Sequence, residues 1–381
     1  MLNIAMMFVL VLVSPLSFSQ SKMPPMDRVY DTIYFEDDLD FEYMEIAINR
    51  QLKYFNKANL SQTMRFGSTT IKRSHLKKSL LKFQELVVTT KSCLVLNLRE
   101  KCFKDFNNNL NKFFKAYKPL PAKWEKGYKE GKTLFTAYYS PDLHGSKTKT
   151  KVFKNPIYGL PKDKKLARAT SDQINFQGVL KGRGLELFYV SESLYDIWLL
   201  HVEGGGRVQV QNADGTKSYY YLSYKASNKQ SFNMLYKYML EEGMLKKGEA
   251  TIANQRKYFL ENPEHQRDIL KTCPSFIFFS ITESEPLGVK NIPLTIKRSL
   301  ATDYRRMEEY GIINFIKYKK PKFSDDGVKM VPFSRFFINQ DTGGAIKGNA
   351  RSDLYFGFGD DAELSANYIY GLGEQYFLIL K

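Results

Sequence analysis

Two aspartates near the C-terminus lie in settings that suit acid–base catalysis. Asp341 ends a predicted strand over residues 335–341, and Gly343 and Gly344 follow almost directly. Glycine favours a turn here because it enters conformations with positive φ without a steric clash. Asp353 lies in the next predicted strand. A carboxyl group whose pKa is raised toward neutrality can give and take a proton, so the pair predicts acid–base chemistry.

Asp353 is the stronger candidate of the two. The two-residue period of a strand places Leu354 and Phe356 on one face, and Asp353 and Tyr355 on the other. The apolar face can then pack into a core while the acid is displayed on the opposite side. Taken alone, a strand aspartate is more often a surface or turn-stabilising carboxylate than a catalytic group.

The surrounding residues carry a family resemblance. Asp341 to Gly348 match the pattern D-x-G-G-A-I-K-G, and Asp353 to Gly359 match D-[LI]-[YF]-x-G-x-G. In these residues the chain resembles the MltA-type membrane-bound lytic transglycosylases, whose C-terminal 3D domain carries both patterns. Further matching blocks extend the resemblance from residue 135 to residue 381, which is roughly two thirds of the chain. These blocks are 135–141, 155–158, 182–187, 274–279 and 293–295.

The resemblance implies a mainly β fold with some helix. A double-psi β-barrel would hold an inserted smaller β domain and carry an N-terminal helical segment, with a glycan-binding cleft between barrel and insert. The domain boundaries predicted on this basis are 1–20 for a signal peptide, 21–140 for the helical segment and first barrel strand, 141–238 for the insert, and 239–381 for helices and the remaining barrel.

Residue patterns agree with this outline. Residues 36–118 are predicted to be helical, because apolar residues recur at helical spacing after an acidic start at residues 37–40. Stretches 77–88 and 110–117 repeat the pattern, and we expect these helices to cap the barrel. From residue 134 the pattern changes to short alternating segments. Strands are predicted at 134–139, 151–158, 184–190, 196–202 and 207–211, a hairpin turn at 212–215, helices after 232 and 262, and strands again from 276.

The chemistry implied by the resemblance is cleavage of the β-1,4 bond between MurNAc and GlcNAc. A general acid protonates the departing oxygen and, as a carboxylate, then deprotonates the C6 hydroxyl that attacks C1, which gives 1,6-anhydro-MurNAc. The family pattern assigns this role to Asp353. Water is not the nucleophile, so a single carboxyl group suffices. Asp341 would raise the pKa of the acid by its like charge, or order the loop.

Several further positions are expected to bind substrate. Thr136 and Tyr138, in the predicted strand 134–139, would contact sugar hydroxyls and faces. Lys347 would hold a carboxylate of the substrate or stabilise developing negative charge, although a solvent-exposed lysine is a nearly equal alternative. The backbone of Gly343 and Gly344 completes this group.

The chain departs from the family at two places. Glu203 and Gly204, assigned here to substrate binding, lie where the family usually has Q-G-S-G. An ionised Glu203 only accepts hydrogen bonds, so it would be tolerated, alter substrate preference, or act as a second acid. Residues 303–311 lack both prolines of the family's D-P-R-x-I-P-L-G, which predicts a remodelled loop beside the cleft.

Charge and composition limit the partners. The formal net charge of +17 indicates an acidic partner. Charge alone does not separate nucleic acid, anionic lipid and an acidic cell-wall polymer, and no recognition motif for nucleic acid accompanies it. Peptidoglycan strands are the partner that the resemblance implies, and the protein is expected to be a monomer. The four histidines lie in no metal-ligand spacing, and we expect neither a metal nor a cofactor. Cys93 and Cys102 either form a bridge or serve as small buried residues.

The first residues predict export. Residues 4–13 form an apolar segment, followed by small and polar residues through Gln20, and the segment is too short to span a bilayer comfortably. We therefore expect an exported protein of the periplasm or cell envelope. Many family members are lipoproteins anchored at a cysteine, but the first cysteine here is Cys93, so no lipid anchor is expected. Association with the outer membrane is left open.

Three functions compete on the sequence. The first is a lytic transglycosylase that uses Asp353. The second is an inverting glycoside hydrolase with Glu203 or Asp341 as the base, which requires a carboxyl separation of about 6.5 to 9.5 Å. The third is a non-catalytic peptidoglycan-binding protein, which the altered residues around Glu203 and Asp303 would favour.

Overall fold

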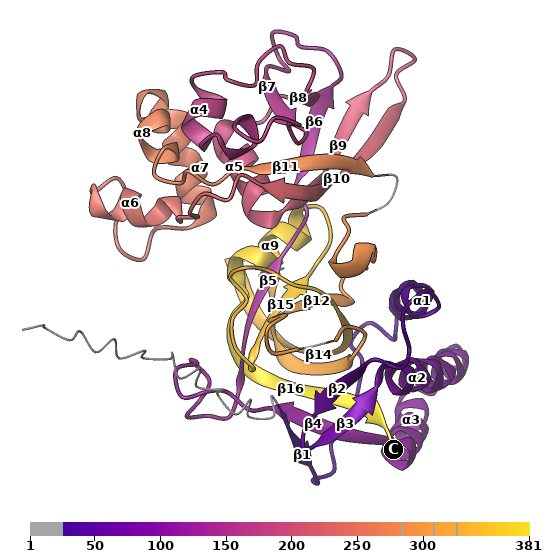
Figure 1. The fold of residues 1–381 in the computed structure, drawn as a ribbon. Coiled ribbons are helices and arrows are strands. Elements are labelled where there is room, and N and C mark those ends of the chain that lie inside the picture. The colour runs from indigo at the N-terminus through magenta and orange to yellow at the C-terminus, as the bar shows by residue number, and fades with distance from the viewer. Residues whose placement is uncertain (1–25, 283–284, 308, 325–326) are drawn as a thin grey trace, which may run out of the picture.

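The structure, a computed structural model, describes residues 26–282, 285–307, 309–324 and 327–381 (Figure 1). The predicted signal peptide at residues 1–20 lies outside the described residues. Within the described part, no helix combines the length and apolar character needed to cross a membrane. Two β units are stacked along the long direction of the molecule, with helices α1 to α3 beside the lower one (Figure 1).

The lower unit is a closed β-barrel. Its eight-stranded sheet has the order β1-β4-β16-β13-β14-β12-β15-β5, and the pairing of β16 with β5 closes the last six strands on themselves. The strands are β1 (Met26–Val29), β4 (Phe114–Pro119), β5 (Thr133–Tyr138), β12 (Ser299–Thr302), β13 (Ile313–Ser324), β14 (Gly327–Asp341), β15 (Arg351–Tyr355) and β16 (Tyr370–Leu380). The predicted mainly β fold with a barrel is confirmed.

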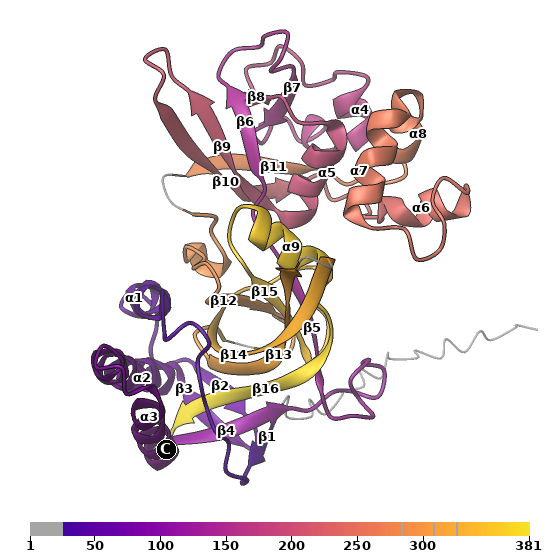
Figure 2. The ribbon, with the colours of Figure 1, turned by 180° about the vertical axis from the view of Figure 1, so that it is seen from behind.

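Alternation along the strands fills the barrel. Leu354 and Phe356 are buried in a cluster with Phe135 and Phe337, as predicted for one face of the strand. Asp353 points the other way and is only half-buried. Helix α9 (Asp360–Tyr368) follows β15 and lies between the barrel and the upper unit in both side views (Figure 2).

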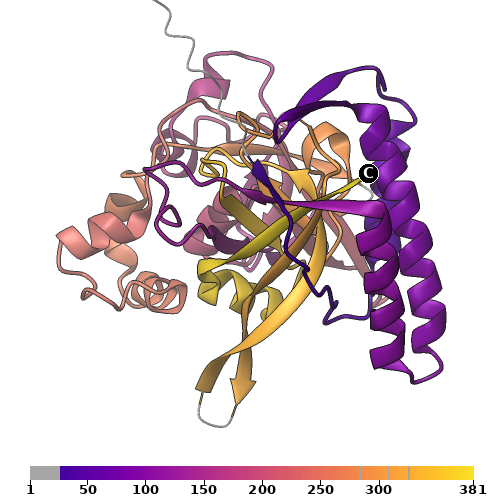
Figure 3. The ribbon, with the colours of Figure 1, turned by 90° about the horizontal axis from the view of Figure 1, so that it is seen from below.

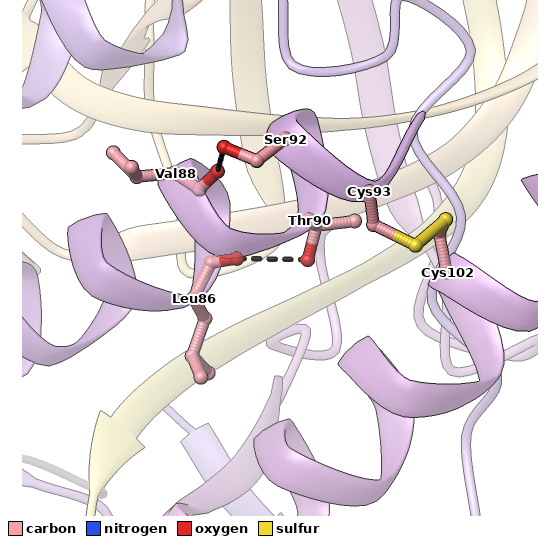
Figure 4. The surroundings of a disulfide bond; sticks show 6 residues. All are labelled: Leu86, Val88, Thr90, Ser92, Cys93 and Cys102. Atoms are coloured by element: carbon pink, nitrogen blue, oxygen red, sulfur yellow. Dashed lines mark hydrogen bonds between the residues drawn. A yellow bond between two sulfur atoms is a disulfide. The ribbon is translucent and has the colours of Figure 1, made fainter. Parts of the chain in front are cut away.

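Three helices flank the barrel, as the view from below shows (Figure 3). They are α1 (Met44–Phe55), α2 (Arg73–Leu94) and α3 (Arg99–Phe113), with the hairpin β2 (Thr63–Phe66) and β3 (Thr69–Lys72) between the first two. Cys93 and Cys102 form a disulfide where α2 and α3 meet (Figure 4). The apolar faces of the three helices share a core with barrel residues such as Phe336.

Two predictions for this region are wrong. The expected helix at 110–117 ends at Phe113, because residues 114–119 pair with both β16 and β1 as strand β4. The acidic start of the helical segment has a different role as well. Asp37 is fully buried in an ion pair with Arg298 (2.6 Å), and α1 begins only at Met44.

The upper unit is a six-stranded sheet with helices on one side (Figure 2). Its order is β11-β10-β9-β6-β8-β7. The strands are β6 (Asp142–Ser146), β7 (Asn155–Tyr158), β8 (Glu186–Val190), β9 (Gly205–Gln211), β10 (Lys217–Ser227) and β11 (Ile277–Thr282). The helices are α4 (Ser171–Asn175), α5 (Leu194–Glu203), α6 (Leu235–Glu241), α7 (Ile252–Glu261) and α8 (Gln266–Leu270), and the 3-10 turns of the whole chain are η1 (Leu166–Arg168), η2 (Pro263–His265) and η3 (Val289–Asn291).

The predicted end of this unit at residue 238 is too early. Strand β11 pairs with β10 in the same sheet, and α7 and α8 share a core with α5. The unit therefore continues to Thr282. The prediction failed because helices that return after a strand region resemble a new domain, whereas their packing partner lies about sixty residues earlier in the chain.

The predicted strand at 196–202 is also wrong, because these residues belong to helix α5. The side chain of Ser193 accepts a hydrogen bond from the amide of Asp196 and caps the helix start. Gly204 ends the helix with a φ of 75°, a conformation that glycine adopts without strain. A short apolar run suits either a strand or a buried helix, and the two caps decide for the helix.

Candidate active site

Asp353 lies where three strands meet below the upper unit. In the sheet it is level with Thr136 of β5 on one side and Ala301 of β12 on the other. The Thr136 hydroxyl donates a hydrogen bond to Asp353 Oδ1 at 2.5 Å. The structure therefore brings together two of the predicted site residues that are 217 positions apart in the chain.

Burial raises the pKa of Asp353, while the charge of Arg351 and the Thr136 hydrogen bond oppose the rise. The net shift is upward, which helps this carboxyl group to keep a proton near neutrality. Arg351 is a residue to which the sequence analysis gave no role. Its spacing of two from Asp353 in a strand was the available signal, because such residues share a face.

Asp341 ends β14 on the other side of Ala301. It is level with Ala301 in the sheet, as Asp353 is, so β12 separates the two aspartates. Strands are about 4.8 Å apart, which puts their Cα atoms about 9 to 10 Å from each other. The Tyr138 hydroxyl donates to Asp341 Oδ2 at 2.6 Å, and the Thr342 amide donates to Oδ1 at 2.8 Å.

The pKa of Asp341 is raised to about 6. Burial is the main cause; the charge of Asp353 adds to it, and the hydrogen bonds from Tyr138 and Thr342 oppose it. Burial also raises the pKa of Tyr138 well above its usual value, so Tyr138 remains a hydrogen-bond donor. Its ring packs against Tyr355, with the centroids 5.1 Å apart.

Glu203 ends helix α5 in the upper unit and approaches the barrel at Tyr139. The Tyr139 amide donates to Glu203 Oε2 at 3.4 Å. Burial first, and then the charge of Asp353, raise the pKa of Glu203 well above its usual value, which favours its protonated form. Gly204 contributes backbone geometry to this helix end, where its amide donates to the Leu200 carbonyl oxygen.

The turn between β14 and β15 differs from its prediction. Gly343 and Gly344 do not have positive φ, whereas Gly348 does, at 117°. The Gly348 amide donates to the buried Asp303 at 2.8 Å, and a side chain at this glycine would collide with Glu125. The sterically restricted glycine is therefore Gly348, at the far end of the turn. The carboxylates of Asp303 and Glu125 accept hydrogen bonds from the backbone amides of Gly348 and Ala350 there.

Lys347 lies exposed in the same turn. Within the described ranges, its ammonium has no ion pair with Asp341 or Asp353. The remodelled loop at 303–311 contacts the turn instead, because Asp303 binds the Gly348 amide. Asp303 also accepts a hydrogen bond from Arg305 Nε at 2.8 Å. This loop therefore holds the backbone that connects the two aspartates.

A residue missed from the sequence is Gly288, in the segment that returns from the upper unit to the barrel. A Cβ atom here would collide with the backbone of Gln340 and with Leu294, and it would lie 3.3 Å from Asp341 Oδ1. The segment thus passes directly beside Asp341. Only a glycine permits this approach, a signal that sequence alone conveys poorly.

The cavity on the barrel flank lies away from the site carboxyl groups, and the described residues include no cluster that could hold a metal. A cavity of about 940 Å³ lies on the barrel flank, lined by Tyr34, Asp38, Lys317, Phe333 and Glu374 among others, and it contains none of the site carboxyl groups. In the part of the chain that the structure describes, no three His, Cys, Asp or Glu residues are grouped to hold a metal.

The fold and the site together define a class of protein: a closed β-barrel that carries a second β unit, with a cluster of three carboxyl groups of raised pKa at their junction. Comparisons agree on the family. The profile of the MltA specific insert domain matches residues 134–280, and that of the 3D domain matches residues 298–377.

The membrane-bound lytic murein transglycosylase A of Vibrio cholerae is 33% identical over 258 residues, 67% of this chain and 67% of that protein. A homolog of this enzyme from Buchnera aphidicola is 24% identical over 331 residues, 82% of this chain and 86% of that one. The chain belongs to the MltA family of membrane-bound lytic murein transglycosylases.

Solved structures share the fold. A membrane-bound lytic murein transglycosylase from Agrobacterium tumefaciens has a TM-score of 0.69 and 24% identity, over 93% of this chain and 97% of that chain. MltA of E. coli with bound chitohexaose has a TM-score of 0.69 and 20% identity, over 95% of this chain and 96% of that chain.

Proposed function

We propose that the protein is a peptidoglycan lytic transglycosylase that cleaves the MurNAc–GlcNAc β-1,4 bond and forms 1,6-anhydro-MurNAc. The observation that carries this proposal is the setting of Asp353. It is a carboxyl group of raised pKa, bonded to Thr136 at the junction of barrel and upper unit, in the motif that the family shares.

Asp353 acts first as the general acid. Its proton passes to the glycosidic oxygen as the bond to C1 of MurNAc breaks, and GlcNAc leaves with a free hydroxyl. The Asp353 carboxylate then takes the proton of the MurNAc C6 hydroxyl, whose oxygen forms the new bond to C1. The acid is regenerated, no water is consumed, and no metal or other cofactor is required by these steps.

The other carboxyl groups support this cycle. Asp341, tied to Tyr138, orders the strand end beside the acid and adds negative charge there as its pKa of about 6 is passed. The raised pKa of Glu203 favours its protonated form, in which it donates as well as accepts hydrogen bonds to sugar hydroxyls. Lys347 and the backbone of Gly204, Gly343 and Gly344 complete the substrate-binding group.

The partner is the glycan strand of peptidoglycan, for which the net charge of +17 suits an acidic polymer. Export by the segment at residues 1–20, a position in the cell envelope, a monomeric state and contact with the outer membrane belong to the same proposal. The solved E. coli relative was obtained with chitohexaose, and the family members named here are membrane-bound enzymes.

The test is mass spectrometry of muropeptides released from sacculi in water enriched in oxygen-18. We expect anhydro products without the label from the wild type, and their loss in Asp353→Asn. Asp214→Asn, in the exposed hairpin turn, is the matched control and should behave as the wild type. Products with a labelled reducing end would contradict the proposal, as would activity retained in Asp353→Asn.

A second candidate is an inverting glycoside hydrolase. The placement of Asp341 and Asp353 on either side of Ala301 favours it, because Cα atoms about 9 to 10 Å apart are compatible with the carboxyl separation of about 6.5 to 9.5 Å that this reaction requires. In that reaction Asp341 would activate the water and the label would enter the product. Release of no product, with binding to sacculi retained, would point to a peptidoglycan-binding protein instead.

A further inference from the structure

The hydrogen bonds around Asp353 run in a single direction. Arg351 Nη2 donates to Thr136 Oγ1 at 2.7 Å, and Thr136 Oγ1 donates to Asp353 Oδ1 at 2.5 Å. A guanidinium group has donors only. Thr136 must therefore accept from Arg351, and its single hydroxyl proton is left for Asp353.

This direction determines where the proton of the acid lies. If Asp353 carried its proton on Oδ1, the Thr136 hydroxyl would have to turn its own proton away and give up the hydrogen bond that it donates to Asp353. The arrangement that keeps the Thr136 bond to Oδ1 has the proton on Oδ2, which has no hydrogen bond within the described residues. A carboxyl group held in this way offers a proton from one defined oxygen.

Arg351 is held in an unusual way for a partly buried cation. Its guanidinium donates to Thr136 and, through Nη1, to the Ser352 carbonyl oxygen at 2.8 Å, and no carboxylate pairs with it in the ranges that the structure describes. Burial lowers the pKa of Arg351, which reflects the cost of removing this charge from water. The charge of Asp353 is the main influence that opposes this effect.

We propose that Arg351, acting through Thr136, is a positioning residue that keeps the Asp353 proton on Oδ2 and stabilises the carboxylate once the proton has left. The inference rests on the proposed role of Asp353 as acid and base. On this proposal, the acid step and the base step depend on different interactions of Asp353. Burial favours the acid that starts the cycle, and the Arg351 charge favours the base that ends it.

Other titratable groups surround Asp353. Asp341 lies beyond β12, Glu203 approaches from α5, Tyr138 follows on β5, and Tyr370 of β16 lies near Arg351. The negative charge of Asp353 raises the pKa of Asp341, Glu203 and Tyr138. Arg351 is therefore the cationic group that favours an ionised Asp353, while these neighbours disfavour it.

The test compares Thr136→Val with Thr133→Val. Both threonines lie on β5, but the buried Thr133 hydroxyl has no hydrogen-bond partner within the described residues, which makes it the matched control. We expect Thr136→Val to lower kcat by about 10- to 100-fold through loss of positioning. Thr133→Val should leave kcat unchanged, and Thr136→Ser, which keeps the hydroxyl, should restore most of the activity.

Titration of the Asp353 carboxyl group gives a measurement that does not depend on activity. Carbon-13 NMR of protein labelled at the aspartate carboxyl carbon reports its pKa, and the signal lost in Asp353→Asn identifies it. We expect the pKa to rise in Thr136→Val and in Arg351→Met, because each removes an interaction that favours the carboxylate. The basic limb of the pH profile of kcat/KM should move to higher pH in both variants.

Arg351→Lys distinguishes the effect of the positive charge from the effect of the hydrogen-bond direction. It keeps the cation, so the pKa of Asp353 should stay near the wild-type value, while kcat falls because an ammonium lacks the fixed geometry of the fork. An unchanged pKa of Asp353 in both Thr136→Val and Arg351→Met would overturn the inference. Full activity of Asp353→Asn, together with the expected pKa shifts of Asp353 in Thr136→Val and Arg351→Met, would instead refute the proposed function. It would leave the positioning of Asp353 by Arg351 and Thr136 in place.

Discussion

The barrel and the upper unit hold their carboxyl groups in different ways. On the barrel, Asp353 and Asp341 lie on paired strands and accept hydrogen bonds of 2.5 to 2.8 Å from Thr136, Tyr138 and Thr342. On the upper unit, Glu203 ends a helix, and within the described ranges its carboxyl group accepts one hydrogen bond, of 3.4 Å, from the Tyr139 amide. The barrel side is preorganised by its sheet, and the upper side is more loosely held.

From this difference we expect the two sides to have separate tasks. Proton transfer requires placement within a fraction of an ångström, which a network of sheet and side-chain hydrogen bonds provides. A helix end joined by one long contact is suited to adjust the substrate rather than to perform the chemistry. The departure from the family pattern at Glu203 falls on this second side, while the motif around Asp353 is intact.

The largest effect in this comparison is expected for Asp341→Asn. The amide nitrogen of asparagine would face one of two donors, Tyr138 or Thr342, where the wild type has two acceptor oxygens. We expect kcat to fall by about 10- to 100-fold as the strand end shifts. Muropeptide release measures this, with Asp214→Asn as the control. An unchanged kcat would show that the acid does not need this support.

The raised pKa of Asp341 predicts a pH-dependent stability. The folded protein holds this proton up to a pKa of about 6, whereas the unfolded chain releases it near 3.9. The favourable contribution is complete below pH 4 and is lost as the pH rises through 6. The free energy of unfolding of Asp341→Asn, relative to the wild type, should therefore increase by on the order of 2 kcal/mol between pH 4 and pH 7.

Urea denaturation across this pH range measures the difference. Asp214→Asn again serves as the control, because this exposed turn residue has no raised pKa. A flat difference between wild type and Asp341→Asn would mean that Asp341 ionises as freely in the folded protein as in the unfolded chain.

A small effect is expected on the upper side. Glu203→Gln keeps the size of the side chain and an oxygen that accepts from the Tyr139 amide, and the raised pKa of the wild-type group favours its neutral form. We expect kcat/KM at neutral pH to change by less than about threefold, which is the scale of one modest hydrogen bond. A drop comparable to that of Asp353→Asn would make Glu203 part of the chemistry and remove the distinction between the two sides.

The smallest effect concerns the link between the units. Arg256 on α7 pairs with Asp196 of α5 (2.7 Å) and with Glu363 of α9 (3.0 Å), so it joins the upper unit to the barrel. These ion pairs are partly exposed, and Arg256→Met should lower the free energy of unfolding by roughly 0.5 kcal/mol. Thermal denaturation measures this, with Lys257→Met as the exposed control on the same helix. A loss of several kcal/mol would show that the units depend on this pair.

Local patterns predicted much of the barrel side. On the barrel, the strand at 134–139 and the inward side chains of Leu354 and Phe356 follow from alternation, and in the upper unit the hairpin at residues 212–215 follows from turn residues that are contiguous in the chain. The expectations for 196–202 and 110–117 were wrong, because a helix cap decides the first and pairing with β16 decides the second.

The sequence by itself determined the strand that carries Asp353, the face on which this acid lies and, through its motifs, the family. Only the tertiary structure decided that Thr136 bonds Asp353, that Arg351 directs this bond and that β12 separates Asp353 from Asp341. The physical reason is the range of the interactions. Alternation of side chains is a property of neighbouring residues, whereas strand pairing joins residues more than two hundred positions apart, and no local pattern specifies the partner.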